Sequence, residues 1–599
     1  MNLTTLDWAI IGAYFLFALA IGIGVSRSAG KDLQEFFLSG RNMPWWLLGV
    51  SMVATTFSSD TPNLVTGFVR EDGVAKNWSW WAFLLTGMLT VFVYAKLWRR
   101  ANILTDIEFY ELRYSGWAAA FLRGFRALYL GLLFNVMVMG AVSLAAIKFG
   151  EIILGIPGWQ TLLIAGSITL AYSAFGGLRA VVVTDFVLFV LAMVGSVWAC
   201  VYLLGLPEVG GLGALLEHPE VRGRLGLVPD FSDASQYIPL LLIPLAVQWW
   251  ASYYPGAEPG GGGYIAQRMF SAQDEKQAIG ATLLFNVAHY ALRPWPWILI
   301  GLASLVVFPT LGDIQQAFPT LSEGKLGHDV AYPAMLTRLP PGLLGLVAAS
   351  LIAAFMSTMS TQINLGASYL VNDFYQRFLK PGATQKELVA AGRFFTVLSM
   401  VLGIGLGLLF QDATQAFNLL LLLGAGTGLI YILRWFWWRI NAYTEIIAMI
   451  ASLIIAGYFT FLHDRTGFLP MADWQKIAIG AALTTAIWIL SVFVTPATKQ
   501  ETLVAFYRRI RPAAFGWKPV IEQAHAEGIE LDVEPGQLPL EIACMVIGCL
   551  TVYGTLFAMG YWLYGQAGPA TASTLVAAGG AFFLFRVWGR LRTQKAEEG

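Results

Sequence analysis

The stretch Ala354-Phe-Met-Ser-Thr-Met-Ser-Thr361 places four hydroxyl groups within five positions of a long apolar run, 343–370. A run of this length and hydrophobicity is typical of a helix buried in a membrane. At helical spacing three of the hydroxyls share one face and the fourth lies beside it: Ser357, Ser360 and Thr361, then Thr358. Hydroxyl oxygens and freed backbone carbonyls are hard ligands that suit a small alkali cation. Buried Ser and Thr also bond the carbonyl one turn back or join helices, so this stretch alone leaves both interpretations open.

The composition of the whole chain is that of a membrane protein with many spans. Of 599 residues, 57% are hydrophobic and 12% are charged, whereas soluble domains carry about 25% charged residues. Lys and Arg number 37, as do Asp and Glu, so the net charge says nothing about partners. From the hydrophobic composition we expect the lipid bilayer as the surroundings, and we expect no nucleic-acid partner. All three cysteines (Cys200, Cys544 and Cys549) lie in apolar segments, which argues against a disulfide framework or a CxxC metal site.

Apolar runs of about 20 residues predict roughly fifteen membrane spans. They lie at 7–26, 45–68, 78–98, 127–149, 157–175, 180–204, 237–258, 279–308, 342–371, 389–410, 415–438, 442–462, 473–495, 540–564 and 571–588. The first run lacks a basic leader and a cleavage site, which favours a retained helix over a signal peptide. Basic residues gather in alternate loops, all on one side if the N-terminus is outside and the C-terminus cytoplasmic; they include Arg113, Arg268 and Arg434.

Two of the predicted spans are interrupted by residues that break helices. Span 45–68 contains Ala54-Thr-Thr-Phe-Ser-Ser-Asp-Thr-Pro62, and span 237–258 runs into Tyr254-Pro-Gly-Ala-Glu-Pro-Gly-Gly-Gly-Gly-Tyr264. These spans open two candidate five-helix units, 45–204 and 237–438. Corresponding breaks in two halves indicate an inverted-repeat transporter with a binding site near mid-membrane. The halves share no sequence identity, so this interpretation rests on position and breakage.

The remaining segments lie outside these two units. Residues 1–44 carry an N-terminal helix and an inner loop, 205–236 form an outer loop, and 439–599 carry C-terminal helices with a basic, partly amphipathic inner segment at 496–539. A second outer loop at 309–341 is rich in Pro and Gly and is expected to carry a short helix. We therefore predict an all-α polytopic membrane protein with one extra helix before the repeat and about four after it.

Five short motifs, taken in order, make the chain resemble the sodium:solute symporter family, which includes sodium/galactose, sodium/proline and sodium/sialic acid cotransporters. They are Phe36-Phe-Leu-Ser-Gly-Arg41, Glu108-Phe-Tyr-Glu-Leu-Arg-Tyr114, Ala171-Tyr-Ser-Ala-Phe-Gly-Gly-Leu178 leading to Thr184-Asp185, Tyr264-Ile-Ala-Gln-Arg268, and the Ser/Thr helix followed by Asp373-Phe-Tyr375. Each motif is weak alone, and the likeness runs from the first span to residue 440. The resemblance implies the LeuT-type fold with its 5+5 inverted repeat, and symport of a small polar solute with sodium.

The resemblance also implies where sodium binds, with Na⁺ as the cofactor of transport. The site combines three backbone carbonyls with two hydroxyls: Ala54, Phe57, Ala354, Ser357 and Thr358. Some members hold a second sodium ion, and the matching residues in this chain are Asp185, Ser360 and Thr361. The alternative for Asp185 is a charge satisfied near the inner end of its helix, where Arg179 lies close in sequence.

The solute site is harder to predict, because the insert Pro255–Gly263 departs from the family pattern. The candidate solute-binding residues are Asp60, Thr61, Glu258, His289 and Arg293. Counted from Arg268, His289 matches a lysine that contacts sugar in galactose transporters, and Arg293 lies one turn further on the same face. An intramembrane Arg is costly, so Arg293 contacts solute or pairs with Glu258 or Asp60 to brace the bundle. His289 is alternatively a hydrogen-bonded packing residue.

Aromatic residues make up 14% of the chain. Most are expected in an interfacial belt, including Trp45, Trp46, Trp80, Trp81, Trp437 and Trp438. One or two residues next to the second break are expected to stack on the solute or gate it: Trp249, Trp250, Tyr253 and Tyr254.

Several classes of function fit a polytopic membrane protein. The chain contains no HExxH, Ser/His/Asp or CxxC arrangement and no phosphate-binding loop, which disfavours an enzyme or an ATP-driven pump. A sensor or channel without coupled uptake, and a proton-coupled symporter that uses Asp185 and His289, are alternatives. The hydroxyl cluster has no role in a proton scheme. We therefore favour a sodium-coupled importer in the cell membrane that carries a sugar, an amino acid or a carboxylate.

Overall fold

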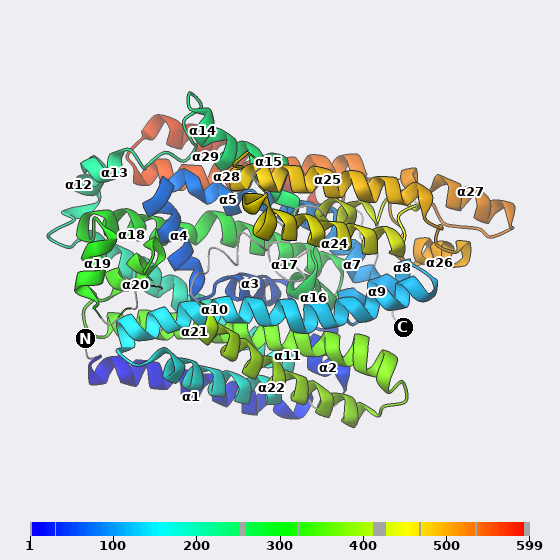
Figure 1. The fold of residues 1–599 in the computed structure, drawn as a ribbon, viewed down its shortest axis with the longest axis horizontal. Helices are drawn as coiled ribbons and strands as arrows, with labels where there is room; N and C mark the ends of the chain where they lie inside the picture. The colour runs from blue at the N-terminus through cyan, green and yellow to red at the C-terminus, as the bar shows by residue number, and fades with distance from the viewer. Residues whose placement is uncertain are drawn as a thin grey trace.

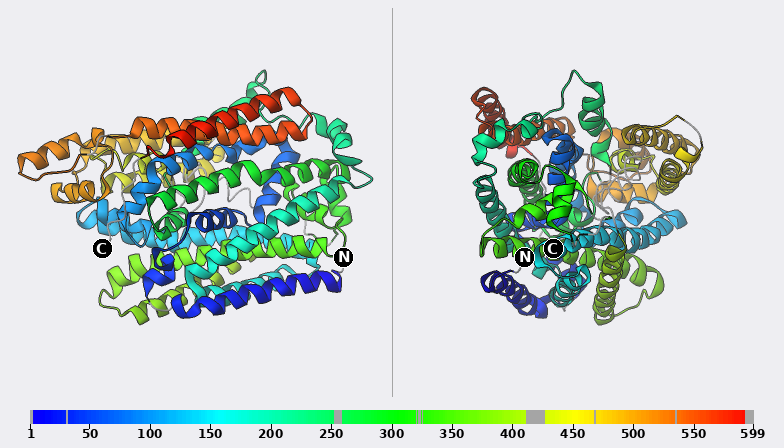
Figure 2. Two further views of the ribbon diagram at one scale, coloured as in Figure 1. Left: turned by 180° about the vertical axis from the view of Figure 1, so that it is seen from behind. Right: turned by 60° about the vertical axis from the view of Figure 1, so that its left-hand side comes forward.

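The computed structural model describes residues 3–29, 32–251, 259–319, 321, 324, 326–410, 427–466, 469–533 and 536–591. In this part of the chain the regular elements are helices, and the long ones run along one common direction (Figure 1). Two further views show the same bundle from behind and turned toward its end (Figure 2). The predicted all-α polytopic class is confirmed.

The helices before the loop 205–236 are α1 (Thr5–Ala29), α2 (Leu33–Leu38), α3 (Trp45–Thr56), α4 (Asp60–Asp72), α5 (Trp78–Trp81), α6 (Leu84–Leu89), α7 (Ala95–Ala101), α8 (Phe109–Arg113), α9 (Gly116–Leu128), α10 (Asn135–Phe149) and α11 (Gly158–Leu204). The next group comprises α12 (Gly211–Glu217), α13 (Pro219–Arg222), α14 (Ala234–Tyr237), α15 (Ile243–Ala246), α16 (Gly263–Ser271), α17 (Glu275–Val287), α18 (Pro294–Val307), α19 (Leu311–Ala317), α20 (Ala331–Leu336), α21 (Leu343–Ser368) and α22 (Gln385–Leu409). The last are α24 (Ala442–Gly457), α25 (Asp473–Val494), α26 (Gln500–Ile510), α27 (Lys518–Ala526), α28 (Leu538–Leu563) and α29 (Ala567–Trp588).

Short π-helical turns join several of these helices into longer rods. Thr90–Tyr94 connects α6 to α7, Tyr129–Phe134 connects α9 to α10, and Ala288–Leu292 connects α17 to α18. A longer π-helical stretch, Tyr369–Leu379, continues α21. Each such turn shifts the side chains that follow it out of the regular helical register.

Ten of the described helical stretches are long and apolar enough to cross a membrane: Val74–Ala101, Gly116–Leu154, Gly177–Leu204, Glu275–Val307, Leu343–Leu379, Gln385–Leu409, Ala442–Leu462, Asp473–Val494, Leu538–Leu563 and Ala567–Trp588. Three shorter apolar helices match the predicted first, second and seventh spans: Thr5–Ile21, Trp45–Thr56 and Ala234–Ala246. The predicted span 157–175 is the first part of α11, before its kink at Gly177. Residues 411–426, within or next to the predicted span 415–438, lie outside the described residues.

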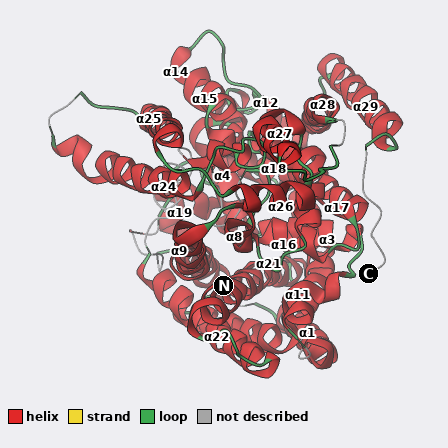
Figure 3. Ribbon diagram, turned by 90° about the vertical axis from the view of Figure 1, so that its right-hand side faces the viewer, coloured by secondary structure: helices red, strands yellow, loops and turns green. Residues whose placement is uncertain are grey.

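The helix α21 lies in the middle of the bundle, as the view from the end of the molecule shows (Figure 3). It packs against α1, α3, α10, α11, α16 and α22. Its side chains from Ala348 to Leu370 are all buried. The hydroxyl cluster therefore lies inside the protein.

The first predicted break lies where the sequence places it. The helix α3 ends at Thr56, Phe57 adopts extended backbone (φ −98°, ψ 90°), and the chain becomes helical again at Asp60 in α4. The second unit also lacks a continuous helix, because turns at Gly260 and Gly261 with φ near +90° precede α16.

The loop 309–341 and the C-terminal segment 496–539 match their predicted secondary structure in part. The loop 309–341 carries the short helices α19 and α20. In the inner segment, α26 packs against α7 and α8, and Trp517 donates to the Trp435 carbonyl at 3.0 Å. This segment is amphipathic as predicted, but its apolar face is buried against the bundle.

Three arginines that the sequence places in inner loops are buried. Arg268 and Arg113 are 0% exposed and Arg434 is 2% exposed. Arg113 donates to the Arg434 carbonyl at 3.0 Å, and Arg434 lies 3.5 Å from Glu445. Because loop charges and packed arginines look alike in a sequence, the orientation in the membrane stays a prediction.

Candidate ion and solute site

The broken helix α3 and the hydroxyl face of α21 are in direct contact. Thr358 Oγ1 donates to the Thr55 carbonyl at 2.9 Å, and the hydroxyls of Thr55 and Thr361 lie 3.2 Å apart. The Ser360 hydroxyl instead donates to the Ser357 carbonyl one turn back, at 2.9 Å. Ser360 therefore bonds within its own helix, as buried hydroxyls often do, whereas the hydroxyls of Thr358 and Thr361 contact a neighbouring helix.

Asp185 on α11 joins these two helices. Its carboxylate accepts from Ser51 Oγ at 2.6 Å and from Ser357 Oγ at 2.5 Å. Its cationic partner is Arg268, with 3.8 Å between Nη2 and Oδ2. The sequence suggested Arg179 for this role, but Arg179 is exposed on the same helix. The charge of Asp185 is thus balanced by a residue distant in sequence.

Arg268 is the residue of this region whose role the sequence analysis missed. Its guanidinium donates to Thr361 Oγ1 at 2.8 Å, to Ser51 Oγ at 3.3 Å and to Thr55 Oγ1 at 3.4 Å. It thereby links α16 to α3, α11 and α21. The signal was an arginine within an otherwise apolar helical stretch. We call the connected set the polar cluster: Ser51, Thr55, Asp185, Arg268, Ser357 and Thr361.

The five predicted sodium ligands lie on the two sides of one contact. Ala54 and Phe57 flank the end of α3, and the Ala54 carbonyl accepts from the Phe57 N–H at 3.1 Å. Ala354, Ser357 and Thr358 lie on the facing part of α21, and Ala54 and Ala354 are fully buried. The Phe57 ring stacks on Trp297 at 5.2 Å and an angle of 11°, which holds the break against α18.

A cavity lies beside the break, with roughly 880 Å³ of space including its open mouth. Its walls come from α4, from the rod α5–α7, from α16 and from the rod α17–α18, and the residues are Thr56, Thr61, Leu64, Val65, Trp80, Phe83, Thr86, Gly87, Thr90, Ala251, Gly261, Tyr264, Ile265, Thr282, Phe285, Asn286, His289, Tyr290 and Arg293. Its lining is mostly apolar and aromatic with a few polar groups, as is common in sites for small organic ligands.

The predicted solute-binding residues are only partly brought together. Thr61, His289 and Arg293 line the cavity, whereas Asp60 begins α4 and is not part of its wall. Glu258, Tyr253 and Tyr254 lie outside the described residues. Trp249 and Trp250 do not line the cavity, and the neighbouring Ala251 does.

Arg293 contacts the end of the broken helix. Its Nη1 donates to the Val53 carbonyl and its Nη2 to the Thr56 carbonyl, each at 3.1 Å. These are carbonyls of the last turn of α3, where the helix dipole favours a positive charge. The guanidinium also lies 5.5 Å from the centre of the Trp297 ring. Arg293 thus braces α3 through backbone carbonyls, partners that the sequence analysis did not consider.

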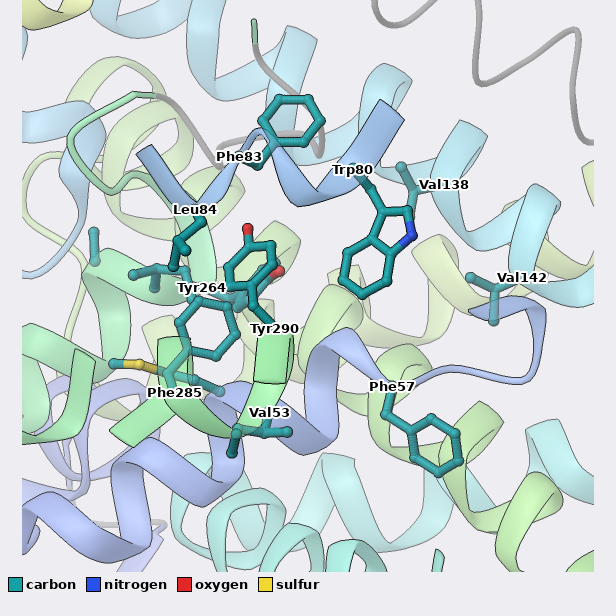
Figure 4. Close-up of a cluster of buried hydrophobic side chains, with 14 of the residues drawn as sticks. Val53, Phe57, Trp80, Phe83, Leu84, Val138, Val142, Tyr264, Phe285 and Tyr290 are labelled. Carbon is teal, nitrogen blue, oxygen red and sulfur yellow. The ribbon is translucent and has the colours of Figure 1, made fainter. Parts of the chain in front are cut away.

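Aromatic rings form much of the cavity wall, and one of them, Trp80, was predicted to lie at the membrane interface. Trp80 was expected in the interfacial belt with Trp81, but the two are 5% and 0% exposed. Trp80 stacks on Tyr290 at 5.7 Å and 23°. Tyr264, Phe285 and Tyr290 lie close together, with Phe83 and Trp80 around them (Figure 4). The π-helical turns at Thr90–Tyr94 and Ala288–Leu292 lie on two of the walls, so a regular helical period does not reveal which residues face inward.

Comparisons with known proteins agree with this architecture. The profile of the Sodium:solute symporter family matches residues 36–452. The chain is 26% identical over 489 residues to the sodium/glucose cotransporter of Vibrio parahaemolyticus, covering 78% of this chain and 87% of that protein. It is also 26% identical over 501 residues to the sodium/myo-inositol cotransporter 2 of Homo sapiens, covering 78% and 71%.

A solved structure supports the same fold. The substrate-bound outward-open structure of a Na⁺-coupled sialic acid symporter superposes with a TM-score of 0.67 at 19% identity, covering 83% of this chain and 99% of that one. Sodium is a co-transported substrate in such proteins and not the bound cofactor that the sequence analysis named. Because the family profile spans most of the chain, including both breaks and α21, this multi-pass membrane protein belongs to the sodium:solute symporter family, a family of transporters and not of enzymes.

Proposed function

We propose that the protein is a sodium-coupled symporter of the cell membrane that imports a small polar organic solute, a sugar, an amino acid or a carboxylate, by alternating access. In this proposal residues 45–204 and 237–438 are the two five-helix units of a LeuT-type fold. The N-terminus is outside and the C-terminus is cytoplasmic. The breaks that open both units support this assignment.

The observation that carries the proposal is the contact between Thr358 Oγ1 and the Thr55 carbonyl at 2.9 Å. It brings the hydroxyl-bearing turn of α21 against the break in α3. An ion between them would be held by the carbonyls and hydroxyls of Ala54, Phe57, Ala354, Ser357 and Thr358. Uncharged oxygens suit an ion that must bind and then leave.

Coupling follows from thermodynamic linkage. Sodium between α3 and α21 favours the state in which these helices are in contact, and the cavity wall at Thr56 and Thr61 belongs to the same broken segment. Each ligand shifts the equilibrium only by its difference in affinity for the two states. A membrane potential of 100 mV contributes about 2.3 kcal/mol per sodium, which supports an accumulation of about 50-fold.

We also propose a second sodium site at Asp185, Ser360 and Thr361. Arg268 lies 2.8 Å from Thr361 Oγ1 and 3.8 Å from Asp185 Oδ2, so an ion there shares these oxygens with the guanidinium. With two sites, sodium activation of uptake is expected to be sigmoidal, and Asp185→Asn is expected to make it hyperbolic. A hyperbolic wild-type curve with one charge per solute would leave Asp185 as the partner of Arg268 only.

Flux into proteoliposomes tests the proposal. Uptake of labelled glucose, mannose, myo-inositol, proline and N-acetylneuraminate is measured with a sodium gradient, with potassium instead of sodium, and with a proton gradient alone. We expect uphill uptake of at least one solute only in the sodium gradient, increased by an inside-negative potential. Uptake driven by protons alone, or downhill flux that does not depend on sodium, would contradict sodium coupling.

A further inference from the structure

We propose that the cavity recognises its solute through the solute's hydrogen-bond donors, and that the solute is neutral and rich in hydroxyl groups instead of a carboxylate. This inference rests on the proposed symport function and names the class of solute at the same site. It follows from the direction of the hydrogen bonds that the wall residues already make with the protein.

Four of the five threonines on the wall use their hydroxyl hydrogens on backbone carbonyls. Thr56 donates to the Val53 carbonyl at 2.8 Å, Thr61 to the Thr56 carbonyl at 3.2 Å, and Thr90 to the Thr86 carbonyl at 2.8 Å. Thr282 donates to the carbonyls of the preceding turn at 3.0 Å. A hydroxyl has a single hydrogen, so these four present their oxygens only as acceptors. Three of the five oxygens already accept from the protein, Thr86 from the Gly260 N–H at 3.2 Å, Thr61 from the Ser58 N–H at 3.4 Å and Thr56 from Arg293 Nη1 at 3.3 Å. The oxygens of Thr90 and Thr282 are open to a solute.

The tautomer of His289 can be assigned from the same bonds. Its Nδ1 lies 3.1 Å from Thr56 Oγ1, and the hydrogen of that hydroxyl is directed at a backbone carbonyl. Nδ1 therefore carries the hydrogen and donates it to Thr56. In the neutral ring the other nitrogen, Nε2, then has a lone pair and is an acceptor. At the position where the resemblance places a lysine donor, this chain has a hydrogen-bond acceptor.

Asn286 contributes a second acceptor one turn away. Its Nδ2 donates to the Thr282 carbonyl at 2.8 Å, which fixes the orientation of the amide. Its Oδ1 is buried at the wall and has no hydrogen-bond partner among the described residues. Oδ1 lies against Gly87, where an added Cβ would stand only 1.8 Å away. A buried acceptor without a partner is expected to be satisfied by a ligand or by water.

Arg293 is the one charged side chain among the described lining residues, and it interacts electrostatically with Asp60 at the start of α4. Among the described lining residues there is no carboxylate, which an ammonium group would need as its partner. Arg293 directs Nη1 and Nη2 at the carbonyls of α3. Trp80 uses its indole N–H on Asn77 Oδ1 at 2.9 Å and presents its ring face to the cavity. A polyol combines hydroxyl hydrogens for the acceptors with C–H faces for the aromatic rings.

Binding of matched solutes to the full chain in sodium tests this inference. Glucose and glucuronate share one ring and differ in a CH₂OH or a carboxylate, and myo-inositol is a second neutral polyol. Binding is followed by tryptophan fluorescence and by thermal shift in detergent. We expect glucose or myo-inositol to bind at least tenfold more tightly than glucuronate. Equal or tighter binding of glucuronate, or no binding of either polyol, would overturn the inference.

Fluorine substitution tests the direction of the hydrogen bonds. Replacing one hydroxyl of the bound polyol by fluorine removes a donor and keeps the size. If the wall residues accept hydrogen bonds from the solute, each replacement of a contacted hydroxyl should lower the affinity for the solute about tenfold. In His289→Phe, which has no ring nitrogen, the loss at one ring position should disappear, whereas Thr396→Val on α22 should behave as wild type. If the wild type binds the fluorinated analogues as tightly as the parent polyols, the wall does not accept hydrogen bonds from the solute, and the inference is overturned.

The two proposals fail in different ways. Binding of a neutral polyol without sodium-driven uptake would contradict symport and support the solute class. Sodium-driven uptake that prefers glucuronate or proline would support symport and overturn the solute class.

Discussion

The polar cluster and the cavity lie on two sides of the same broken helix, and they differ in how their polar atoms are satisfied. In the cluster, Asp185 accepts two hydroxyl hydrogen bonds and faces Arg268. At the cavity, Asn286 Oδ1 has no hydrogen-bond partner among the described residues, and the hydroxyls of Thr90 and Thr282 donate to backbone carbonyls, which leaves their oxygens as acceptors. A group with protein partners contributes to stability, whereas a group without one is available to a solute. Changes in the cluster should therefore affect folding and sodium, and changes at the cavity should affect the solute.

The largest effect is expected from Arg268→Gln. Removing one partner of a buried ion pair leaves Asp185 without compensation, which typically costs about 3–5 kcal/mol. We expect a lower yield of folded protein and a lower midpoint of thermal unfolding in detergent. Arg377→Gln is the matched control, because Arg377 pairs with Glu111 in an exposed position.

The double variant Arg268→Gln with Asp185→Asn sharpens this prediction. Neutralising the carboxylate should restore part of the stability, so the two changes should be strongly non-additive. An Arg268→Gln protein as stable as the wild type would remove the distinction between cluster and cavity.

The next effect concerns sodium alone. Ser357→Ala combined with Thr358→Ala removes two proposed ligands worth about 1 kcal/mol each. We expect the sodium concentration for half-maximal uptake to rise at least tenfold, while the solute affinity at saturating sodium changes much less. Ser350→Ala is the control, since this buried hydroxyl of α21 donates to the Val347 carbonyl. An unchanged sodium dependence would exclude this site from the mechanism.

Arg293 lies between the cavity and the polar cluster, because it lines the cavity and contacts α3. Substituting it therefore tests whether the two regions are separate. If it braces the helix, Arg293→Lys should lower thermal stability by about 1–2 kcal/mol through lost charge-assisted bonds. Combined with Thr56→Val, the loss should be non-additive, because Nη1 lies 3.3 Å from Thr56 Oγ1. Selective loss of affinity for an anionic solute, at unchanged stability, would instead assign Arg293 to solute binding.

The smallest effect is expected from Gly87→Ala. The new methyl group would displace the Asn286 amide, which would move into the cavity or rotate away. We expect a severalfold loss of solute affinity and an unchanged sodium activation curve, since the atoms nearest to the added Cβ belong to Asn286 and not to the polar cluster. A shift in sodium activation as large as that of the double hydroxyl variant would show that the two regions do not act separately.

The same contrast explains what the sequence can predict. The hydroxyls of α21 lie on one regular helix within five positions, and Asp60-Thr-Pro62 marks the break in α3 directly. Local spacing and helix-breaking residues therefore suffice to predict the all-helical fold and the break, whereas the meeting of α3 with α21 was implied by the family resemblance. Roughly fifteen spans were predicted, and ten stretches of the described residues are long and apolar enough to cross a membrane. The broken helices are too short to qualify alone, and half of the predicted span 415–438 lies outside the described residues.

The cavity is different, because four separate parts of the chain build it. His289 and Thr90 belong to π-helical turns, which change the side-chain register. Trp80 is of a residue type that is common at the membrane interface, and it lines the cavity only because it packs on Tyr290. Arg268 resembles a loop cation until α16 packs against α21. Such roles depend on tertiary contacts, which no local pattern contains.

The short helix α16 has a consequence for inhibitor design. One part of its surface supplies Tyr264 and Ile265 to the cavity wall, and another places Arg268 on Thr361 of α21. A compound that fills the cavity and displaces Tyr264 would also displace the arginine that faces Asp185. Because the guanidinium shares the oxygens of Asp185 and Thr361 with the proposed second ion, the compound would change sodium affinity without contacting a sodium ligand, and by reciprocity its own potency would depend on sodium by the same factor. Measuring potency at several sodium concentrations would therefore show whether a compound acts through α16.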